Sequence, residues 1–244
     1  MVCLLIYTRR EARRYLVRVL ILCSLVVICG SMLFVLPFYN YGGASMLILV
    51  ILFFVSIYLL QPAVSKYRIW AQGASGEELV AEKLSQLPSS YQVFNDVTLP
   101  GYGANLDHVV VGPTGVFVVE TKSHKGYISY EKGEWLQRKW GRRGTEYFGR
   151  IGNPSRQAEI AAQKLASYIN KELKDFSKPV SVIPLLVFTN PETILHTNKS
   201  PVKVLRPNQV PIYILKHRPK EKLSLEKVAR IGLVMRKTMR RGAA

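Results

Sequence analysis

Two long apolar runs open the chain and differ sharply from the alternating pattern that follows them. Residues 15–38 carry Arg18 as their only charged residue, and residues 42–60 carry no charged residue. As helices, runs of this length cross a hydrocarbon core of about 30 Å. Only a few residues separate the two runs. The pattern therefore predicts a transmembrane helical hairpin within a membrane anchor at residues 1–70.

Basic residues flank this hairpin, whereas the loop between the two runs carries no charge. Lys66 and Arg68 follow the second run, and five arginines lie before or at the start of the first: Arg9, Arg10, Arg13, Arg14 and Arg18. The positive-inside rule then places both termini, and the rest of the chain, in the cytoplasm. We expect a multi-pass protein of the cytoplasmic (inner) membrane. A cleaved signal peptide is the alternative for the first run, but that run is long and a second follows.

After residue 70 the period of the pattern changes. Residues 76–87 have apolar positions at helical spacing behind Ser75, a candidate N-cap. Residues 91–99 alternate like a half-buried strand, and residues 105–122 form two β-rich runs around a Gly-Pro-Thr-Gly turn. A further strand pair is predicted at residues 126–140.

The second half of this region predicts helices and strands in alternation. Asn153 and Pro154 begin a helix that continues to residue 170, and residues 178–189 form an apolar strand. A strand that follows a helix in this way indicates a crossover connection, and hence an α/β fold with a mixed sheet flanked by helices. Short strands are predicted at residues 202–205 and 210–216. Residues 224–241 form a basic amphipathic helix with an apolar stripe made of Leu225, Val228, Gly232, Met235 and Met239.

The hairpin at residues 105–122 carries the candidate chemistry. A turn centred on Pro113 and Thr114 places Asp107 opposite Glu120. Facing carboxylates destabilise a strand pair unless a cation compensates them. Lys122, two residues beyond Glu120 and on the same face, is one candidate; a divalent metal such as Mg²⁺ is the other. The alternative is a purely structural role, in which Glu120 and Lys122 form an ion pair at a sheet edge.

The charge of the chain favours a polyanionic partner. The 34 basic residues outnumber the 16 acidic ones, for a net charge of +18, which points to nucleic acid or anionic lipid. The excess is uneven, since residues 71–122 carry two basic and six acidic residues, whereas residues 199–244 carry 13 and two. All three cysteines lie within the first 29 residues, so a cysteine-based zinc site is excluded for the rest of the chain.

Two basic segments are candidate contacts for these partners. Around Trp140 lie four basic residues that interleave with the aromatic ring and could contact phosphates: Arg138, Lys139, Arg142 and Arg143. A solvated hairpin tip is the alternative. The C-terminal amphipathic helix could pack on the domain and face nucleic acid, or contact anionic lipid. His108 alternates onto the face opposite Asp107, so we expect it to pack in the core or behind the site.

The order helix, strand, acidic hairpin, helix, strand resembles the PD-(D/E)xK nuclease core, and the local sequence resembles the nuclease-related domain (NERD) family. The segments that carry this resemblance are Gly76-Glu77-Glu78-Leu79-Val80, Leu106-Asp107-His108, Gly115-Val116-Phe117, Glu120-Thr121-Lys122, Gly126, and Asn153-Pro154 with Gln157. The resemblance implies a restriction-endonuclease-like α/β fold at residues 71–195, followed by a basic C-terminal extension at residues 196–244. It also makes a membrane-anchored bacterial form plausible.

The resemblance further implies roles for five residues. Asp107 and Glu120 would bind Mg²⁺ or Mn²⁺, Lys122 would be the catalytic lysine, and Glu77 and Gln157 would be accessory residues of the site. The leading hypothesis is a membrane-tethered, metal-dependent nuclease acting on DNA. The rival is a noncatalytic membrane-bound module that keeps the fold and binds nucleic acid or protein.

Overall fold

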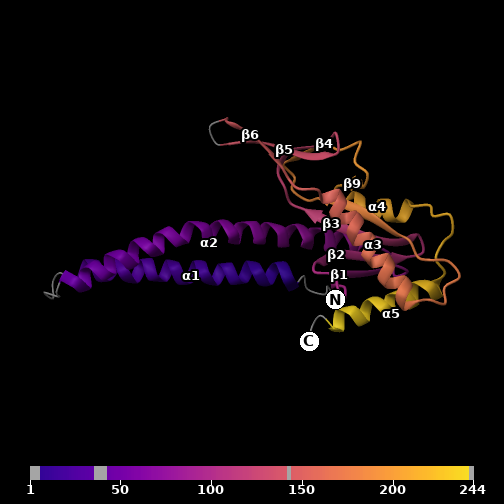
Figure 1. Ribbon diagram of the computed structural model, residues 1–244, viewed down its shortest axis with the longest axis horizontal. Helices are drawn as coiled ribbons and strands as arrows, with labels where there is room; N and C mark the ends of the chain where they lie inside the picture. Colours follow the sequence, from indigo (N-terminus) through magenta and orange to yellow (C-terminus); the bar gives the residue numbers. More distant parts are fainter. Residues whose placement is uncertain (1–5, 36–42, 142–143, 242–244) are drawn as a thin grey trace. The chain divides into compact units, whose positions relative to one another are not determined.

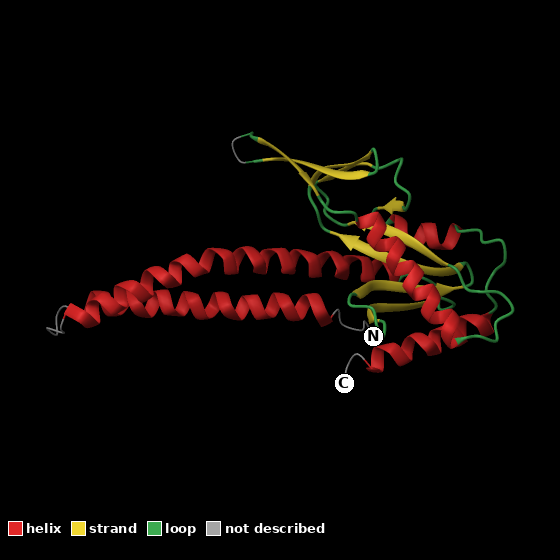
Figure 2. Cartoon of the chain, viewed as in Figure 1, coloured by secondary structure: helices red, strands yellow, loops and turns green. Residues whose placement is uncertain are grey.

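The computed structural model describes residues 6–35, 43–141 and 144–241. The chain divides into two compact units, of which one is Ile6–Ala74 and the other begins at Ser75. Figure 1 follows the order of the elements along the chain, and Figure 2 separates helices from strands. The first unit is entirely helical, and every strand of the described residues belongs to the second.

The first unit contains two long apolar helices. They are α1 (Ile6–Val35) and α2 (Gly43–Leu84). The last turns of α2, from Ser75, belong to the second unit. The segments Tyr7–Val35 and Gly43–Leu84 are long and apolar enough, by length and composition, to cross a membrane. Most of their large apolar side chains are exposed. The predicted end of the first span, at residues 36–38, lies outside the described residues.

The predicted helix start at Ser75 is wrong, because α2 continues through this residue to Leu84 without a break. The physical reason is the cooperativity of helices: extending an existing helix through a glycine costs about 1 kcal/mol, whereas a new helix must pay for its own nucleation. Pro62 also lies inside α2. Local breaker residues therefore did not end this helix.

The second unit is built on a five-stranded mixed sheet, which confirms the predicted fold class. The strand order is β1-β2-β3-β7-β9, with β1, β2 and β3 antiparallel and β7 and β9 parallel to β3. The strands are β1 (Gln92–Thr98), β2 (Asn105–Gly112), β3 (Gly115–Lys122), β7 (Val182–Phe188) and β9 (Lys203–Leu205). The helix α3 (Pro154–Glu172) connects β3 to β7 as the predicted crossover.

Helices cover both faces of this sheet. On one face α3 and α5 (Leu225–Arg241) pack over a core that includes Val109, Val118 and Leu165. On the other face the end of α2 and the short helix α4 (Gln209–Lys216) pack over Val110 and Phe117. The strands β2 and β3 are thus buried on both faces. Burial of this kind fixes the register of the hairpin, since a slip by one residue would exchange the two faces.

A second sheet of four strands, ordered β6-β5-β4-β8, follows β3 along the chain (Figure 1). Its strands are β4 (Gly126–Glu131), β5 (Glu134–Trp140), β6 (Glu146–Arg150) and β8 (Thr193–His196). The strand pair β4–β5 was predicted, whereas β6 and β8 were not. Trp135 anchors this sheet to α3, because its indole Nε1–H donates to Ser155 Oγ at 2.9 Å.

Two predictions for the C-terminal region need correction. Residues 210–216, predicted as a strand, form α4 instead. Pro211 lies in the first turn of this helix, where no backbone N–H is needed, and Val210 and Ile214 point into the core four residues apart. In α5, Val228 and Met235 are buried as predicted, but Leu225 is 70% exposed.

Candidate active site

The hairpin register brings Asp107 to the same end of the sheet as Glu120. The predicted pairing is confirmed from Val111–Val116 to His108–Val119. At the next position the regular ladder gives way to a side-chain contact, in which the Thr121 backbone N–H donates to Asp107 Oδ2 at 2.7 Å. Asp107 is thereby fixed against the strand that carries Glu120.

Glu120 and Lys122 point to one side of β3 and form an ion pair, with Lys122 Nζ 2.7 Å from Glu120 Oε1. The side chains of Lys122 and Glu120 are 21% and 15% exposed. Both groups are therefore partly withdrawn from water but still reachable by a ligand. This ion pair coexists with Asp107 beside it, so the lysine compensates at most one of the carboxylates.

Crowding of negative charge perturbs Asp107. Although the residue keeps some contact with solvent, protein surrounds its carboxyl group, and this desolvation raises its pKa well above the ordinary value. The nearby charges of Glu120 and Glu77 raise the pKa of Asp107 further, against the opposing effects of the Thr121 N–H and Lys122. The negative charges of Glu120 and Glu77 thus act on Asp107, and the Lys122 ammonium offsets part of their effect.

Glu77 reaches this site because α2 passes very close to the ends of β3 and β7. A Cβ atom added at Gly76 would lie 2.6 Å from Thr189 Oγ1 and 3.6 Å from Ser123 Cβ. The Thr189 backbone N–H in turn donates to the carbonyl oxygen of Lys122 at 2.9 Å. A glycine at residue 76 therefore permits the approach that brings the next residue, Glu77, near Asp107.

Gln157 is placed differently from the other predicted site residues. It lies in the first turns of α3, its residue is exposed, and its backbone N–H donates to the carbonyl oxygen of Asn153 at 3.1 Å. Across the described chain, no hydrogen bond or ion pair joins its side chain to Asp107, Glu120 or Lys122. The predicted cap is present, since Asn153 Oδ1 accepts from the Arg156 N–H at 3.0 Å.

Tyr102 was not predicted and lies close to the acidic group. Burial raises the pKa of its hydroxyl, and the charges of Glu120 and Asp107 raise it further. The sequence signal was slight, because Tyr102 belongs to the glycine-rich connection between β1 and β2, whose residues otherwise look like a turn. The structure packs it against the core under α3 and α5.

Three buried polar atoms of the described residues have no hydrogen-bond partner. Among the described residues, the buried side-chain atoms that lack a hydrogen-bond partner are His108 Nε2, Thr121 Oγ1 and His124 Nδ1. His108 and Thr121 adjoin Asp107 and Glu120 in sequence, but alternation along the strands turns their side chains to the opposite face. Buried polar atoms are normally satisfied, and exceptions often mark functional sites. His108 itself is buried and bonded through Nδ1 to Asn95 Oδ1 at 2.8 Å, and burial lowers its pKa to about 3.

The donor set fits a hard cation. Carboxylate oxygens suit Mg²⁺, which usually takes one or two protein carboxylates and completes its shell with water and substrate phosphate oxygens. Asp107 and Glu120 supply two such groups, and burial, followed by the negative charges of Glu120 and Glu77, raises the pKa of Asp107. No cluster of three His, Cys, Asp or Glu residues able to enclose a metal occurs in the part of the chain that the structure describes.

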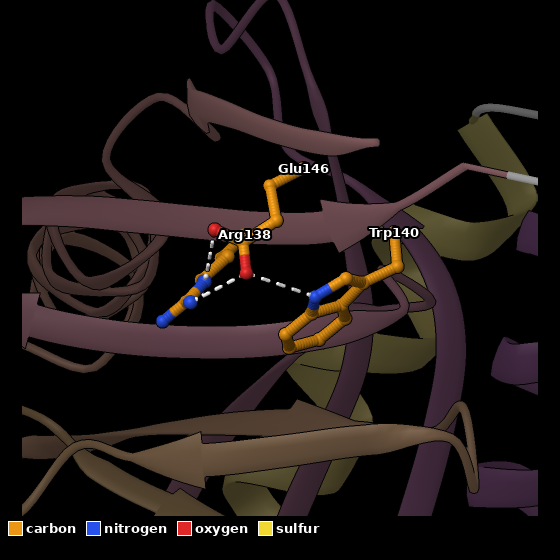
Figure 3. Close-up of polar contacts among 3 residues, drawn as sticks. All are labelled: Arg138, Trp140 and Glu146. Atoms are coloured by element: carbon orange, nitrogen blue, oxygen red, sulfur yellow. Dashed lines mark hydrogen bonds and ion pairs between the residues drawn. The ribbon is translucent and has the colours of Figure 1, made fainter. Parts of the chain in front are cut away.

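Of the four basic residues predicted to contact nucleic acid, Arg138 and Lys139 lie on β5 of the second sheet. Figure 3 shows Arg138 held by Glu146, with Nη2–Oε1 and Nε–Oε2 distances of 2.6 and 3.1 Å. The Trp140 indole Nε1–H donates to the same Glu146 Oε1 at 3.1 Å. Lys139 is exposed. Arg142 and Arg143 lie outside the described residues.

Comparison with known proteins relates part of the chain to one protein family. Residues 72–189 match the family described as nuclease-related domain. The chain is also 43% identical over 84 residues to an uncharacterized protein of Bacillus anthracis; the match covers 32% of this chain and 40% of that protein. The chain thus spans less than half the length of this relative. No solved structure matches this chain. The acidic site therefore lies within the segment, residues 72–189, that matches the nuclease-related domain (NERD) family.

Proposed function

We propose that this protein is a metal-dependent nuclease that hydrolyses phosphodiester bonds in DNA. The observation that carries the proposal is the position of Asp107, fixed by the Thr121 N–H beside the Glu120–Lys122 ion pair at one end of the β2–β3 hairpin. Partly desolvated carboxylates in excess over cations favour the capture of a metal ion. The match to the nuclease-related domain family supports the same reaction class.

Each residue of the site would have a distinct role. Bound Mg²⁺ would polarise the scissile phosphate and lower the pKa of an attacking water; Mn²⁺ takes the same oxygen ligands. Asp107 and Glu120 would hold the ion, and Glu77 would add negative charge beside it. The ammonium group of Lys122, held 2.7 Å from Glu120 Oε1, would donate to a phosphate oxygen or orient the water.

Basic residues outside the site would hold the polyanion. We assign this role to Lys139, together with Arg138 and with Arg142 and Arg143, which continue the same basic run in the sequence. Contact between α5 and anionic lipid is a weaker proposal. Arg230 of this helix is already paired with Asp175 Oδ2 at 2.7 Å, and Arg236 Nη2 donates to Gln92 Oε1 at 2.6 Å.

The two apolar helices would tether the nuclease to the cytoplasmic membrane. The Arg18 guanidinium lies 5.1 Å and the Lys66 ammonium 5.7 Å from the ring centroid of Tyr15. Cations of α1 and α2 therefore gather at one end of the hairpin. Positive charge marks the cytoplasmic side, which supports an orientation with both termini and the domain in the cytoplasm.

Cleavage assays on the full chain in detergent micelles test the proposal. Wild type, Glu120→Gln and the control Glu172→Gln, which removes an exposed carboxylate at the end of α3, would be incubated with plasmid, linear and single-stranded DNA and with RNA. Each reaction is run with Mg²⁺, Mn²⁺ or EDTA. We expect wild type and Glu172→Gln to cleave DNA with metal only, and Glu120→Gln to be inactive.

The rival function predicts a different result. If wild type is folded and binds nucleic acid or a protein but cleaves nothing with either metal, the domain is a noncatalytic binding module. Cleavage that Glu120→Gln retains would overturn the assigned site. Cleavage of RNA alone would keep the site and replace the substrate.

A further inference from the structure

The two apolar helices α1 and α2 enclose a groove between two points at which they touch. At one point the rings of Tyr7 and Trp70 lie with their centroids 6.0 Å apart. At the other a Cβ atom added at Gly30 would lie 3.4 Å from Phe53 Cε2. Between these points, where the helices run side by side (Figure 1), a groove of about 400 Å³ opens. This volume lies within the usual range of ligand sites, about 300–1,000 Å³.

The groove is apolar along most of its length and basic at one end. Arg18 of α1 and Lys66 of α2 line the basic end. The remaining length has an apolar floor, made of Ile21, Leu22, Leu59 and Ala63. A ligand that carries a charged group at one end of an apolar chain fits this order of side chains. A wholly polar ligand would leave the apolar floor without a partner.

Tyr15 lies between the two cations of the groove. The guanidinium carbon of Arg18 is 5.1 Å, and the ammonium nitrogen of Lys66 is 5.7 Å, from the centroid of its ring. The two positive charges are therefore at most roughly 11 Å apart, the sum of these distances. Arg18 and Lys66 are both exposed. One ligand can therefore reach both cations.

No carboxylate compensates these cations within the described part of the helical unit. Glu11 is the only acidic residue of residues 1–74, and it is paired with Arg14 at 2.7 Å. Arg18 and Lys66 take part in no ion pair of the described residues. The groove thus carries two positive charges and no negative one. Two like charges at this separation favour the binding of an anion between them.

The sequence places both cations at the boundary of the apolar region. Residues 19–65 contain no charged residue, so Arg18 and Lys66 stand at its two ends. At about 1.5 Å per residue, α1 extends roughly 25 Å from Arg18 to its end at Val35. This length is close to the thickness of a hydrocarbon core, about 30 Å. The cations would therefore lie at the level of the lipid headgroups, where tyrosine rings are also favoured.

Net charge distinguishes between the phospholipids available at this level. Each has a phosphate, but phosphatidylethanolamine adds an ammonium group, which two cations would repel. Phosphatidylglycerol adds only hydroxyl groups and keeps its negative charge. Basic pockets between membrane helices on the cytoplasmic side bind anionic headgroups in this way. The groove therefore fits an anionic phospholipid better than a zwitterionic one.

We propose that the groove between α1 and α2 binds one anionic phospholipid, whose phosphate contacts Arg18 and Lys66 and whose acyl chain lies along the apolar floor. This inference rests on the proposed membrane tether and does not depend on the nuclease chemistry. Tyr15 is a positioning residue, because its ring holds both cations at the mouth of the groove. The lipid would be a specific partner of the anchor.

Lipid binding to the full chain in a nonionic detergent tests this inference separately from cleavage. Native mass spectrometry would count bound phosphatidylglycerol, and phosphatidylethanolamine with the same acyl chains, over a range of lipid concentrations. Glycerol 3-phosphate supplies the phosphate without acyl chains. The variants are Lys66→Gln and Lys66→Arg. The matched control is Arg68→Gln, because Arg68 is exposed on the same helix but does not line the groove.

We expect one phosphatidylglycerol molecule to bind per chain, about fivefold or more tightly than phosphatidylethanolamine, and no retention of glycerol 3-phosphate. Lys66→Gln should weaken the binding of phosphatidylglycerol by about fivefold, the usual contribution of one basic residue beside anionic lipid. Lys66→Arg keeps the charge and should keep the affinity. Arg68→Gln should change the affinity by less than about twofold, because an exposed charge outside the groove contributes little.

Three outcomes would overturn the inference: equal affinity for the two lipids, equal losses for Lys66→Gln and Arg68→Gln, and binding of glycerol 3-phosphate as tight as that of the lipid. Alkaline carbonate extraction of membranes tests the tether itself. A chain that stays in the membrane but shows no lipid preference would keep the tether and reject the groove. Release of the chain would reject both. Lipid binding that depends on Lys66 in a chain that never cleaves would keep this inference and reject the nuclease.

Discussion

Lys122 Nζ lies 2.7 Å from Glu120 Oε1, on the strand next to the one that carries Asp107. The Lys122 ammonium therefore pairs with one of the two carboxylates that we propose as metal ligands, and it offsets part of the negative charge that acts on Asp107. The lysine is thus placed to exchange a carboxylate partner for a phosphate or water oxygen. The role of Lys122 can therefore be tested separately from metal binding by Asp107 and Glu120.

Lys122→Met should lower the rate of cleavage by about 10²–10⁴-fold, the usual contribution of a positioned group of this kind. Metal binding should persist, since Glu120 loses a competing cation. The measurements are single-turnover cleavage and Mn²⁺ titration of the same preparation. Lys125→Met, which removes an exposed lysine three residues away, is the matched control. Loss of metal binding together with cleavage would show that Lys122 only maintains the structure.

Asp107→Asn should stabilise the metal-free protein increasingly as pH rises. The folded state raises the pKa of Asp107, so the folded protein holds a proton that the unfolded chain has released. Stability of the wild type therefore falls as pH rises from the ordinary aspartate pKa through the raised one. Asparagine removes this dependence and can still accept the Thr121 N–H. Thermal midpoints from pH 4 to 9 in EDTA would show the difference.

Asp175 supplies a control of opposite sign for that experiment. The hydrogen bond from Arg230 lowers the pKa of Asp175, so its contribution to stability is present above the ordinary aspartate pKa and is lost as pH falls through the lowered one. Asp175→Asn should therefore slightly destabilise the protein at neutral pH. If both variants shift the midpoint in the same direction, the charge crowding assigned to Asp107 is wrong.

Gly126→Ala should destabilise the second sheet at its junction with the active site. The residue has φ of +89°, and an added Cβ would lie 2.5 Å from the carbonyl oxygen of Arg138. Gly133→Ala is the matched control, because Gly133 has a similar φ of +86° but open space where the Cβ would lie. We expect the left-handed backbone alone to cost about 1–2 kcal/mol at Gly133. The clash at Gly126 should add about 1–3 kcal/mol, and equal losses in chemical denaturation would rule the clash out.

Trp135 and Ser155 should be energetically coupled. The indole N–H donates to Ser155 Oγ at 2.9 Å, and the Ser155 hydroxyl donates to Asn153 Oδ1 at 2.9 Å. Trp135→Phe and Ser155→Ala should each cost about 1–3 kcal/mol, because each leaves a buried polar partner unsatisfied. The double variant should cost less than the sum. Strict additivity in a double-mutant cycle would mean that the second sheet is anchored by packing alone.

The hairpin could be predicted from sequence because two independent signals agree on it. The Gly-Pro-Thr-Gly turn allows few registers, and the valines on both sides require both faces to be buried. The pairing of Val109 with Val118 followed directly. The N-cap at Asn153 could also be predicted from a local signal, because proline is favoured at the first helical position that follows the cap. Sequence alone was sufficient where a residue type, such as glycine in a turn or proline at a helix start, strongly favours one backbone conformation.

Other features depend on tertiary contacts that the pattern does not contain. A short apolar run such as residues 210–216 fits helix and strand alike, and packing of Val210 and Ile214 decided for α4. The strand β8 exists because it pairs with β4, more than 60 residues away in the chain. Tyr102 entered the site through the same kind of long-range packing.

Mn²⁺ binding, followed by electron paramagnetic resonance on the full chain in detergent at pH 8, tests most directly whether the carboxylates form a metal site. Wild type, Asp107→Asn and Glu120→Gln would be titrated under the same conditions. The account predicts a bound ion in wild type and affinity at least about tenfold weaker in both variants. Equal binding by all three proteins would contradict it, because the ion would then lie elsewhere.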